Sequence, residues 1–471
     1  MSSLTACLAT ALSGLSAAQG AIETTDNNVS NANTPGYSRE VPELVTSDPI
    51  VEDPLTFGTG VTLKNIESVR DPILESQIQQ ETQTQGQFNS LVSALSQTQV
   101  NFTSSTNDIG TAISNFFDSI NSLSTSPADL SLRQGVLTAA QNLATAFNTA
   151  ANNLSAQRTS LNGSVQGDVG QINELTGQIA TLNGKISTLE NSGENALTFI
   201  DQRTQAIDQL SALVDVSVIP ANNSLTLTTA NGTALVLGQT SFNLSTQTTP
   251  AGLQDVYDSQ GKDITSTIVS GQLGGLLEAR DQQIPGFQNQ LDTLAAGIAN
   301  AVNAVQTNGY DLTGTVDQNG NPVKSTNDLF TPPPANTTGA ASSMSVAITN
   351  PSLIAASGDG TAGSNANAEA MYALSSSTTI AGLEGLDPTD YYSGVVFNVG
   401  NAASNANTGQ SAANLSLQQL NDQRASVSGV SLDEEAANLM QYQQAYQASA
   451  QVITTINDMM ETVINMTTLT T

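Results

Sequence analysis

The sequence predicts a mainly α-helical protein with a small inserted β domain. In this fold class, N- and C-terminal coiled-coil helices pair with each other, an elongated helical bundle forms the middle domain, and the β domain lies outermost. Three observations lead to the prediction: apolar heptads at both chain ends, a third heptad series within residues 165–189, and an apolar period that changes to two after Val214. Because 471 residues exceed the size at which a single core usually divides, several domains are expected.

The first 32 residues predict an amphipathic helix that forms one half of a coiled coil. Large apolar residues recur on one of its faces at seven-residue spacing, as a coiled-coil seam requires. The candidate assembly residues on this face are Leu4, Leu8, Leu15, Ile22 and Val29. Cys7, the single cysteine of the chain, is interpreted as a small apolar residue of this helix.

The C-terminal segment repeats the heptad pattern. Ser431 and Glu434 have the spacing of a capping box and mark the start of its helix. The candidate assembly residues here are Leu432, Leu439, Tyr442, Tyr446, Ile453, Ile456, Met460 and Val463. Periodicity alone is equally compatible with two amphipathic helices that pack on one globular core. Because two helices alone bury too little apolar surface to offset the entropy lost on ordering them, we expect them to fray in the monomer and to order when neighbouring subunits cover them.

Charge excludes several classes of partner. The chain has 11 basic and 41 acidic residues, and its net charge of -30 should repel nucleic acid and anionic membranes. Arg39 is the first basic residue and Arg424 is the last, so salt bridges are not expected to pair the terminal helices. The N-terminal residues lack the basic start and the contiguous apolar stretch of a secretory signal, and no segment is expected to span a membrane.

Enzymatic functions find little support. The sequence has no histidine, which removes the usual general base, the Ser-His pair and the His-ligated metal site. The consecutive carboxylates Asp433, Glu434 and Glu435 lie in the first turn of the predicted C-terminal helix, where they favour the helix dipole. A calcium candidate lacks the closing Glu of an EF-hand loop and is better interpreted as a solvated turn; it comprises Asp311, Asp317, Asn319 and Asn321. We therefore predict no catalytic, cofactor-binding or metal-binding residue.

Six segments are predicted along the chain. They are an N-terminal coiled-coil helix (1–32), an extended connector (33–70), the first part of a helical middle domain (71–212), a small outer β domain (213–272), the second part of the middle domain (273–427) with loops at 310–345 and 356–368, and a C-terminal coiled-coil helix (428–471). Asp71 is the expected N-cap of a helix that opens with Pro72. The longest helix is expected to open at Ser126-Pro127 and to run, with one break, to about Leu189.

Two further helices and a set of strands are expected in the middle of the chain. One helix is predicted from about 273 to 306 and another from about 387 to 426. Between Val214 and the helix predicted from about 273, apolar residues alternate around the turn signals Asn222-Asn223 and Asn231-Gly232. This alternation predicts antiparallel strands.

An asparagine-rich string with a tight turn follows the N-terminal helix. Pro35 fixes the backbone, Gly36 permits a positive φ angle, and the preceding asparagines can cap a helix end. The candidate assembly residues in this string are Asn31, Asn33, Thr34, Pro35, Gly36 and Tyr37. A simple local helix stop is the alternative interpretation.

These residues resemble a known family. The string from Asn27 to Arg39 is similar to the signature of flagellar rod, hook and hook-associated proteins, and its Thr34-Pro35-Gly36-Tyr37-Ser38-Arg39 ending is most similar to the hook-associated protein 1 family. The stretch Ser270 to Asp281, with its Gly-Gly-Leu-Leu-Glu-Ala-Arg core, resembles the central motif of that family, and so do Gly309 to Gly314 and Leu432 to Met466.

The resemblance implies a structural role in the bacterial flagellum without enzymatic activity or a cofactor. Such proteins form the ring that joins hook to filament, outside the cell, after export through the flagellar type III pathway without a cleaved signal peptide. The implied partners are further copies of the same chain, the hook protein, a second hook-associated junction protein toward the filament, and an export chaperone on the C-terminal helix. Another axial protein of the rod, hook or second junction, or less plausibly an acidic secreted adhesin with a glycan-binding β domain, remains an alternative.

Overall fold

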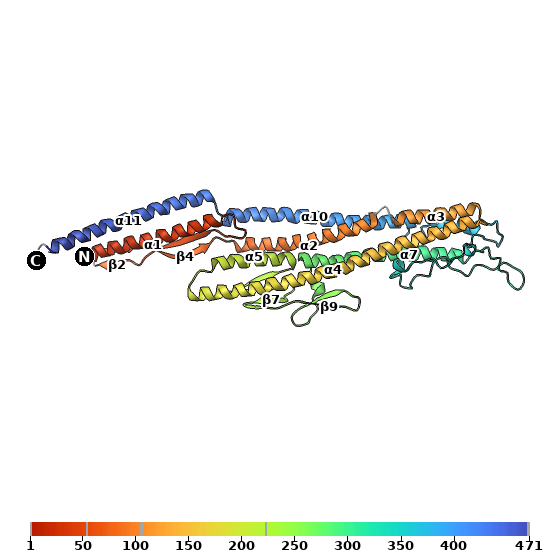
Figure 1. The fold of residues 1–471 in the computed structure, drawn as a ribbon, viewed down its shortest axis with the longest axis horizontal. Coiled ribbons are helices and arrows are strands. Elements are labelled where there is room, and N and C mark those ends of the chain that lie inside the picture. The colour runs from red at the N-terminus through yellow and green to blue at the C-terminus, as the bar shows by residue number, and fades with distance from the viewer. Residues whose placement is uncertain (1, 53–54, 104–107, 222–223, 469–471) are drawn as a thin grey trace. The chain divides into compact units, whose positions relative to one another are not determined.

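A computed structural model describes residues 2–52, 55–103, 108–221 and 224–468 (Figure 1). The described chain is mainly helical with small antiparallel sheets, which confirms the predicted fold class. It divides into two compact units. The terminal unit comprises Met1–Thr84, Gln171–Leu244 and Ala413–Thr471, and the middle unit comprises Gln85–Gly170 and Ser245–Ala412.

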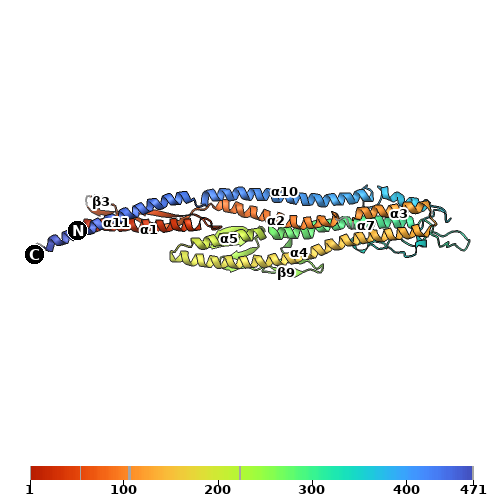
Figure 2. The same cartoon turned by 45° about the horizontal axis from the view of Figure 1, so that its top comes forward.

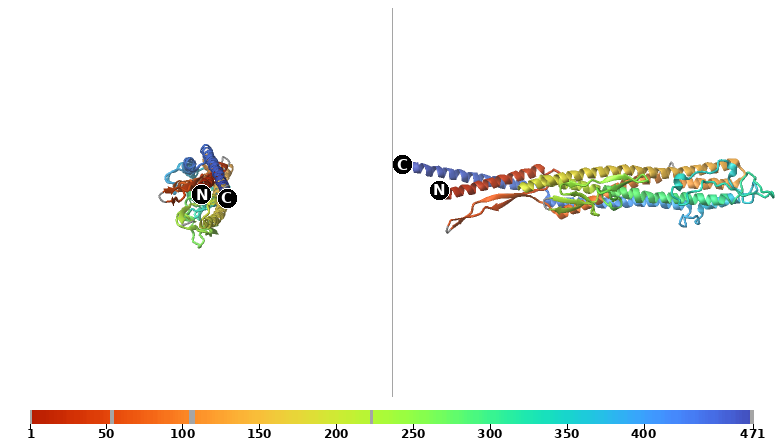
Figure 3. Two further views of the ribbon diagram at one scale, coloured as in Figure 1. Left: turned by 90° about the vertical axis from the view of Figure 1, so that its left-hand side faces the viewer. Right: turned by 90° about the horizontal axis from the view of Figure 1, so that it is seen from below.

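Both chain ends are long helices that pack together in the terminal unit. α1 (Ser2–Asn31) and α11 (Leu432–Thr468) lie side by side in all views, with the N- and C-termini at the same end of the pair (Figures 1, 2 and 3). α5 (Leu197–Leu213) belongs to the same unit. The predicted pairing of the terminal helices is therefore confirmed.

The segment predicted as an extended connector is instead a β-hairpin. β1 (Glu40–Thr46) pairs antiparallel with β4 (Val61–Ser68), with a bulge between Glu43 and Leu44, and the shorter strands β2 (Ile50–Glu52) and β3 (Leu55–Phe57) pair beyond them. The sequence lacks a two-residue hairpin turn between the long strands, and this absence concealed the pairing. The hairpin packs along α1 and gives that helix a second contact surface.

Three long helices agree closely with the apolar periodicity of the sequence. They are α2 (Pro72–Thr103), α4 (Leu130–Ser192) and α10 (Pro388–Ser428). Asp71 caps α2 as predicted, because its Oδ1 accepts from the backbone N–H groups of Ile73 and Leu74 at 2.9 and 3.2 Å. α4 runs without a break and begins at Leu130 rather than at the predicted Ser126-Pro127, because Asp129 caps it.

The predicted β region contains two sheets. A four-stranded antiparallel sheet has the order β5-β6-β7-β8, and a separate hairpin joins β9 and β10. The strands are β5 (Ser217–Ala221), β6 (Ser224–Thr228), β7 (Ala234–Leu237), β8 (Thr240–Ser241), β9 (Ser245–Thr248) and β10 (Gln254–Tyr257). The four-stranded sheet belongs to the terminal unit and the hairpin to the middle unit. The Asn231-Gly232 turn is present, with φ +88° at Gly232, whereas Asn222-Asn223 lies outside the described residues.

The middle unit is built on further helices. They are α3 (Ile109–Thr125), α6 (Gly271–Glu278), α7 (Ile284–Gln306), α8 (Ala340–Ser343) and α9 (Ala366–Ala373), with short 3₁₀ turns at Thr265–Thr267, Pro351–Leu353 and Leu374–Ser376. The single helix predicted from 273 to 306 is interrupted by a π-helical turn at Ala279–Gln283. Pro285 lacks a backbone N–H, and the widened turn before it accommodates the lost bond.

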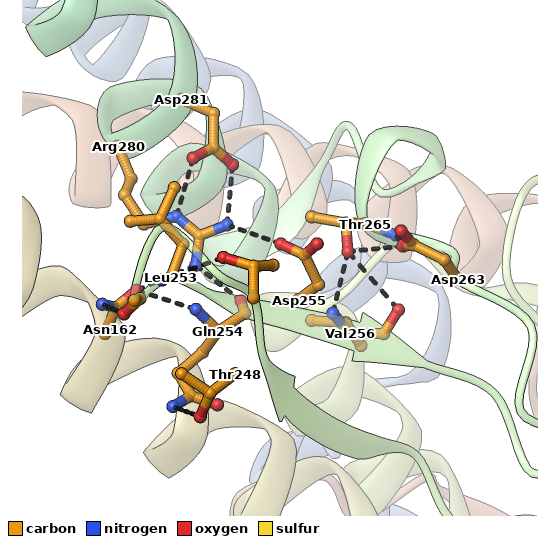
Figure 4. A network of polar contacts seen from close by, with 12 residues as sticks. Asn162, Thr248, Leu253, Gln254, Asp255, Val256, Asp263, Thr265, Arg280 and Asp281 are labelled. Atoms are coloured by element: carbon orange, nitrogen blue, oxygen red, sulfur yellow. Dashed lines mark hydrogen bonds and ion pairs between the residues drawn. The ribbon is translucent and has the colours of Figure 1, made fainter.

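Arg280 in the π-helical turn anchors the β9–β10 hairpin (Figure 4). Its guanidinium is fully buried and pairs with Asp281 through two bonds of 2.7 and 2.8 Å. The same group donates to Asn162 Oδ1 of α4 at 3.1 Å and to the backbone carbonyl of Gln254 in β10 at 2.6 Å. The motif that the sequence analysis compared with a family signature thus holds a strand and two helices together.

One helical segment of the described chain, Leu4–Asn31, is long and apolar enough to cross a membrane by length and composition. Its most apolar window has a mean hydropathy of 1.2, and core helices and N-terminal signal sequences meet the same criterion. The sequence analysis expected no such segment because its alanines, glycines and leucines are interspersed with polar residues. In the structure this helix packs against α11 and the hairpin.

Candidate assembly interface

Small residues form the contact between α1 and α11. Gly14 is the clearest case, because a Cβ atom there would lie 3.2 Å from Ser449 Oγ of α11. The buried residues at three- and four-residue spacing from Gly14 are Ala11, Ala18, Ala21, Thr25 and Asn28. Short side chains at these positions allow the two helices to approach closely.

A second row of small residues on α1 faces the hairpin. A Cβ atom on Gly20 would lie 2.6 Å from Leu63 Cδ2 of β4. Ala17 and Thr24, three residues before and four after Gly20, are buried, and a Cβ atom on Gly60 would collide with Ser13. α1 therefore uses two adjacent small-residue faces within its own chain.

The large apolar residues that the sequence analysis selected are covered to different extents by this packing. Val29 is 42% exposed, Leu432 is 55% exposed and Tyr446 is 38% exposed, whereas Ile456 is buried. The other selected residues of the two helices are half-buried: Leu4, Leu8, Leu15, Ile22, Leu439, Tyr442, Ile453, Met460 and Val463. We call the selected residues of α1 and α11 the heptad stripe. As an interface between subunits it stays a prediction.

The far end of the helix pair brings part of the heptad stripe together. A small apolar cavity of about 70 Å³ is lined by Leu4 and Thr5 of α1 and by Met460, Val463 and Ile464 of α11. Ile464 is also 57% exposed. The pair thus ends in apolar surface that its own chain covers only partly.

Asn28 is the polar centre of the other end. Its Nδ2 donates to the Glu40 carbonyl at 2.8 Å and to Glu435 Oε2 at 3.2 Å. Its Oδ1 accepts from the Tyr37 hydroxyl and from the backbone N–H of Glu40, both at 2.8 Å. All four hydrogen-bonding positions of the buried Asn28 amide are therefore used. These bonds join α1 to the turn at residues 34–37, which we call the signature turn, to the β1–β4 hairpin and to α11.

Burial shifts the pKa values of two ionisable groups around Asn28. It raises the pKa of the Tyr37 hydroxyl, and the nearby Glu40 carboxylate raises it further. Burial also raises the pKa of the Glu40 carboxyl, although the amide of Asn27 donates to it at 3.1 Å and opposes the shift. Tyr37 therefore stays a neutral hydrogen-bond donor to Asn28 at physiological pH.

The turn after α1 has the predicted geometry. Gly36 has φ +81°, and the Tyr37 N–H donates to the Thr34 carbonyl at 3.2 Å. The Thr34 hydroxyl donates to Asn31 Oδ1 at 3.1 Å. Asn31 is half-buried, and the exposed residues of the turn are Asn33, Thr34, Pro35 and Gly36. The positive φ angle of Gly36 is confirmed, and the turn presents its tip to solvent.

The carboxylates at the start of α11 have specific partners. Glu434 pairs with Arg39 at 2.9 Å, and the Arg39 N–H donates to the Ser428 carbonyl at 2.9 Å. Glu435 is buried and bonds Asn28. The predicted absence of salt bridges holds for α1 with α11 among the described residues, but Arg39, eight residues beyond α1, supplies one to α11.

The weaker sequence candidates do not form a site. Among the residues that the structure describes, no group of three or more His, Cys, Asp or Glu side chains could hold a metal ion. Asp317 accepts from the backbone N–H groups of Asn319 and Asn321 at 2.8 and 2.9 Å, as in a solvated turn. Cys7 is an exposed residue of α1.

Sequence reasoning missed several residues of this region. It selected the large heptad residues and passed over the small row parallel to them and the buried polar set of Asn28, Glu40 and Glu435. The recurrence of Ala, Gly and Thr at three- and four-residue spacing was a usable signal. The pairing of Asn28 with Glu435 joins positions 407 residues apart and had no local signal.

Fold and site together define a class: a mainly helical protein whose terminal helices pair and leave part of the heptad stripe exposed. Three family models match the chain. The "Flagellar hook-associated protein FlgK helical domain" covers residues 95–320, the "Flagella basal body rod protein" model covers 8–37, and the "Flagellar basal body rod FlgEFG protein C-terminal" model covers 422–466.

Full-length relatives identify the family. Flagellar hook-associated protein 1 of Bacillus subtilis (strain 168) is 31% identical, and the alignment covers 97% of this chain and 97% of the relative. The protein of the same name from Salmonella typhimurium is 27% identical over 97% of this chain and 99% of its own length. The chain belongs to the flagellar hook-associated protein 1 family, as the signature residues predicted.

A solved structure supports the fold. The flagellar hook junction protein FlgK from Burkholderia pseudomallei superimposes with a TM-score of 0.64 at 20% identity, and the match covers 75% of this chain and 100% of that chain. Because the family is structural, the prediction that this chain is not an enzyme is confirmed.

Proposed function

We propose that this chain forms the junction between flagellar hook and filament, as a ring of identical subunits held together through the terminal helices. Membership of the hook-associated protein 1 family and the likeness to a hook junction protein support this position in the flagellum. The observation that supports the assembly mechanism most directly is that α1 and α11 use small residues and large apolar residues for different contacts. Small residues such as Gly14 lie where the two helices approach closely within one chain, and the exposed members of the heptad stripe, Val29, Leu432 and Tyr446, stay available to neighbours.

The heptad stripe suits subunit contacts physically. Each half-exposed Leu, Ile or Val that a neighbour covers contributes about 25 cal/mol per Å² of apolar area removed from water. Coiled-coil seams of this kind also fix the register between helices. The signature turn, which Asn28 holds against the base of α11, would present Asn33, Thr34 and Pro35 to the same neighbours.

The finer partners belong to the same proposal. The ring contacts the hook protein on one side and a second hook-associated protein toward the filament on the other. Before assembly, an export chaperone covers the exposed apolar residues of α11, and the chain leaves the cell by the flagellar type III route. The large apolar residues of α11 that are exposed and would need such cover are Leu432, Met440, Tyr446, Val452, Met459 and Ile464.

Charge introduced into the heptad stripe tests the mechanism. Val29→Asp and Tyr446→Asp change side chains that are exposed in the single chain, so each variant should fold as a monomer. A carboxylate buried without a partner between subunits strongly disfavours the contact. We expect both variants to remain monomeric in sedimentation velocity under conditions where the wild type assembles.

Val316→Asp provides the matched control, because Val316 is 56% exposed in a turn of the middle unit. It should assemble normally. Wild-type assembly by Val29→Asp and Tyr446→Asp would show that the heptad stripe is not the interface.

A further inference from the structure

Two helices of the middle unit form an antiparallel pair on its surface. The Tyr392 hydroxyl of α10 donates to the Phe102 carbonyl of α2 at 3.4 Å, and the Gln410 amide donates to Asn89 Oδ1 at 2.8 Å. The pair is visible as neighbouring ribbons in Figures 1 and 2. Gly409 lies against the Phe88 ring, where any Cβ atom would collide.

Long parts of these two helices are free of charge, although the chain as a whole is strongly acidic. Residues 85–103 of α2 and 391–412 of α10 contain no Asp, Glu, Lys or Arg, although the chain as a whole carries 52 charged residues (11 + 41). The exposed residues at three- and four-residue spacing on the two helices are Asn89, Ser93, Ser96 and Val100, and Phe397, Asn401, Ser404, Thr408 and Ser411. We call these nine residues the neutral ridge.

Two large apolar side chains stand out from the neutral ridge. Phe397 is 66% exposed and Val100 is 63% exposed. The contact between Tyr392 and Phe102 sets the antiparallel register and places Val100 within about one helical turn of the level of Phe397. Exposed aromatic residues surrounded by short polar ones are typical of protein interfaces.

We propose that the neutral ridge is the surface through which the middle unit packs against a second copy of this chain. The inference rests on the proposed function, in which identical subunits form a ring. Two copies that each carry a net charge of -30 repel wherever their acidic surfaces meet, so close contact between copies favours a face without charge. A partner with basic surface would be drawn instead to the acidic faces. Charge therefore selects a second copy as the occupant.

A charge on the ridge tests this proposal. Phe397→Glu places a carboxylate at the centre of the contact, and Val316→Glu adds the same charge at a comparably exposed position of the same unit. We expect Phe397→Glu to raise the critical concentration for assembly of the full chain at least about tenfold, because like charges across an interface repel. Val316→Glu should assemble as the wild type, and circular dichroism should show that both monomers fold normally.

A cross-linking measurement tests the same contact without adding charge. In a Cys7→Ser background, Phe397→Cys leaves a single thiol, and a maleimide-benzophenone photo-cross-linker attached to it should join the chain to a neighbouring copy in assembled material. Val316→Cys in that background should give little product. Wild-type assembly by Phe397→Glu, or equal cross-linking at positions 397 and 316, would overturn the proposal.

The two proposals fail separately. Normal assembly by Phe397→Glu together with loss of assembly by Val29→Asp rejects the neutral ridge and leaves the terminal interface intact. Loss of assembly by Phe397→Glu together with normal assembly by Val29→Asp supports the ridge and rejects the terminal interface.

Discussion

Amide side chains that are buried or half-buried repeatedly attach non-helical segments to the helices. Asn28 of α1 donates to the carbonyl and accepts from the N–H of Glu40, Asn173 of α4 does the same with Leu244, and Asn303 of α7 with Phe330. Each side-chain amide bonds both the C=O and the N–H of one residue, as the backbone of a neighbouring strand does in a β ladder. These attachments use no charge, which suits a chain in which only 11% of residues are charged.

Asn28→Asp should therefore damage the base of the terminal pair. The substitution removes the donor to the Glu40 carbonyl and to Glu435, and it places a third carboxylate beside two others. We expect a loss of about 2–4 kcal/mol in the stability of this region. Thermal unfolding of the monomer and amide exchange at the end of α1 measure it.

Asn33→Asp is the control, since Asn33 is exposed in the same string. It should change stability by less than about 0.5 kcal/mol. Equal effects of the two variants would show that Asn28 is not the centre of the junction.

Asp168 gives the middle unit a dependence on pH. It is buried on α4, its Oδ1 accepts from Gln272 at 3.1 Å, and its Oδ2 has no hydrogen-bond partner in the described structure. Burial raises the pKa of this carboxyl to about 6. Between the unfolded pKa and pH 6 the folded state thus binds more protons than the unfolded state, so the stabilising contribution is present in acid and is lost as the pH rises through 6.

We expect the free energy of unfolding to fall between about pH 4 and about pH 6, with Asp168 contributing on the order of 1–2 kcal/mol after screening. Asp168→Asn should remove that part of the slope in urea denaturation. Asp317→Asn should leave it unchanged, because hydrogen bonds lower the pKa of exposed Asp317 and move its titration below this range. Burial raises the pKa of Asp208 and Asp215 to about 6 as well, so part of the slope should remain in this variant. A slope that is as steep in Asp168→Asn as in the wild type would contradict the assignment.

At the scale of elements, periodicity and capping were sufficient for most helices. The heptads placed α1 and α11, Asp71 placed the start of α2, and the alternation after Val214 placed the strands. The β1–β4 hairpin was missed because its strands are far apart in sequence, and the π-helical turn was missed because periodicity does not reveal one extra residue per turn. The six predicted segment boundaries stay a prediction.

The candidate interface was harder to predict from the sequence than the helices were. Heptad spacing identifies which large residues share a face, but it does not say whether the same chain or a neighbour covers that face. Gly14 and Gly20 were decisive in the structure because each admits another element at close range. Asn28 has partners 9, 12 and 407 residues away in the sequence, and no local pattern reveals the last of these.

The terminal helices should exchange amide protons faster than the middle unit. Residues on most of the α11 surface are exposed, whereas α3 buries Ile109, Ile113, Phe116, Phe117, Ile120 and Leu123. Local opening of α11 therefore exposes little apolar surface. In the monomer we expect exchange within residues 432–460 to be at least about a hundredfold faster than in α3, and to slow on assembly. Slow exchange of α11 in the monomer would contradict coupled ordering and assembly.

At the scale of the whole molecule, charge and apolar surface are segregated in sequence. The first 38 residues and those after 424 carry acidic charge alone, and long stretches of α2 and α10 carry none. Contacts between copies are therefore expected to depend on apolar and neutral surfaces, with salt acting mainly by screening repulsion. This organisation favours a structural assembly over a binding or catalytic protein.

The central claim is that this chain joins hook to filament. Deletion of its gene in a source strain with one copy, followed by electron microscopy of the cell surface, tests it most directly, with rods, hooks and filaments scored separately. The account predicts hooks without filaments and flagellin shed into the medium, with filaments restored by the wild-type gene but not by Val29→Asp. Missing hooks would place the protein in the rod or hook, and intact flagella would contradict the junction role altogether.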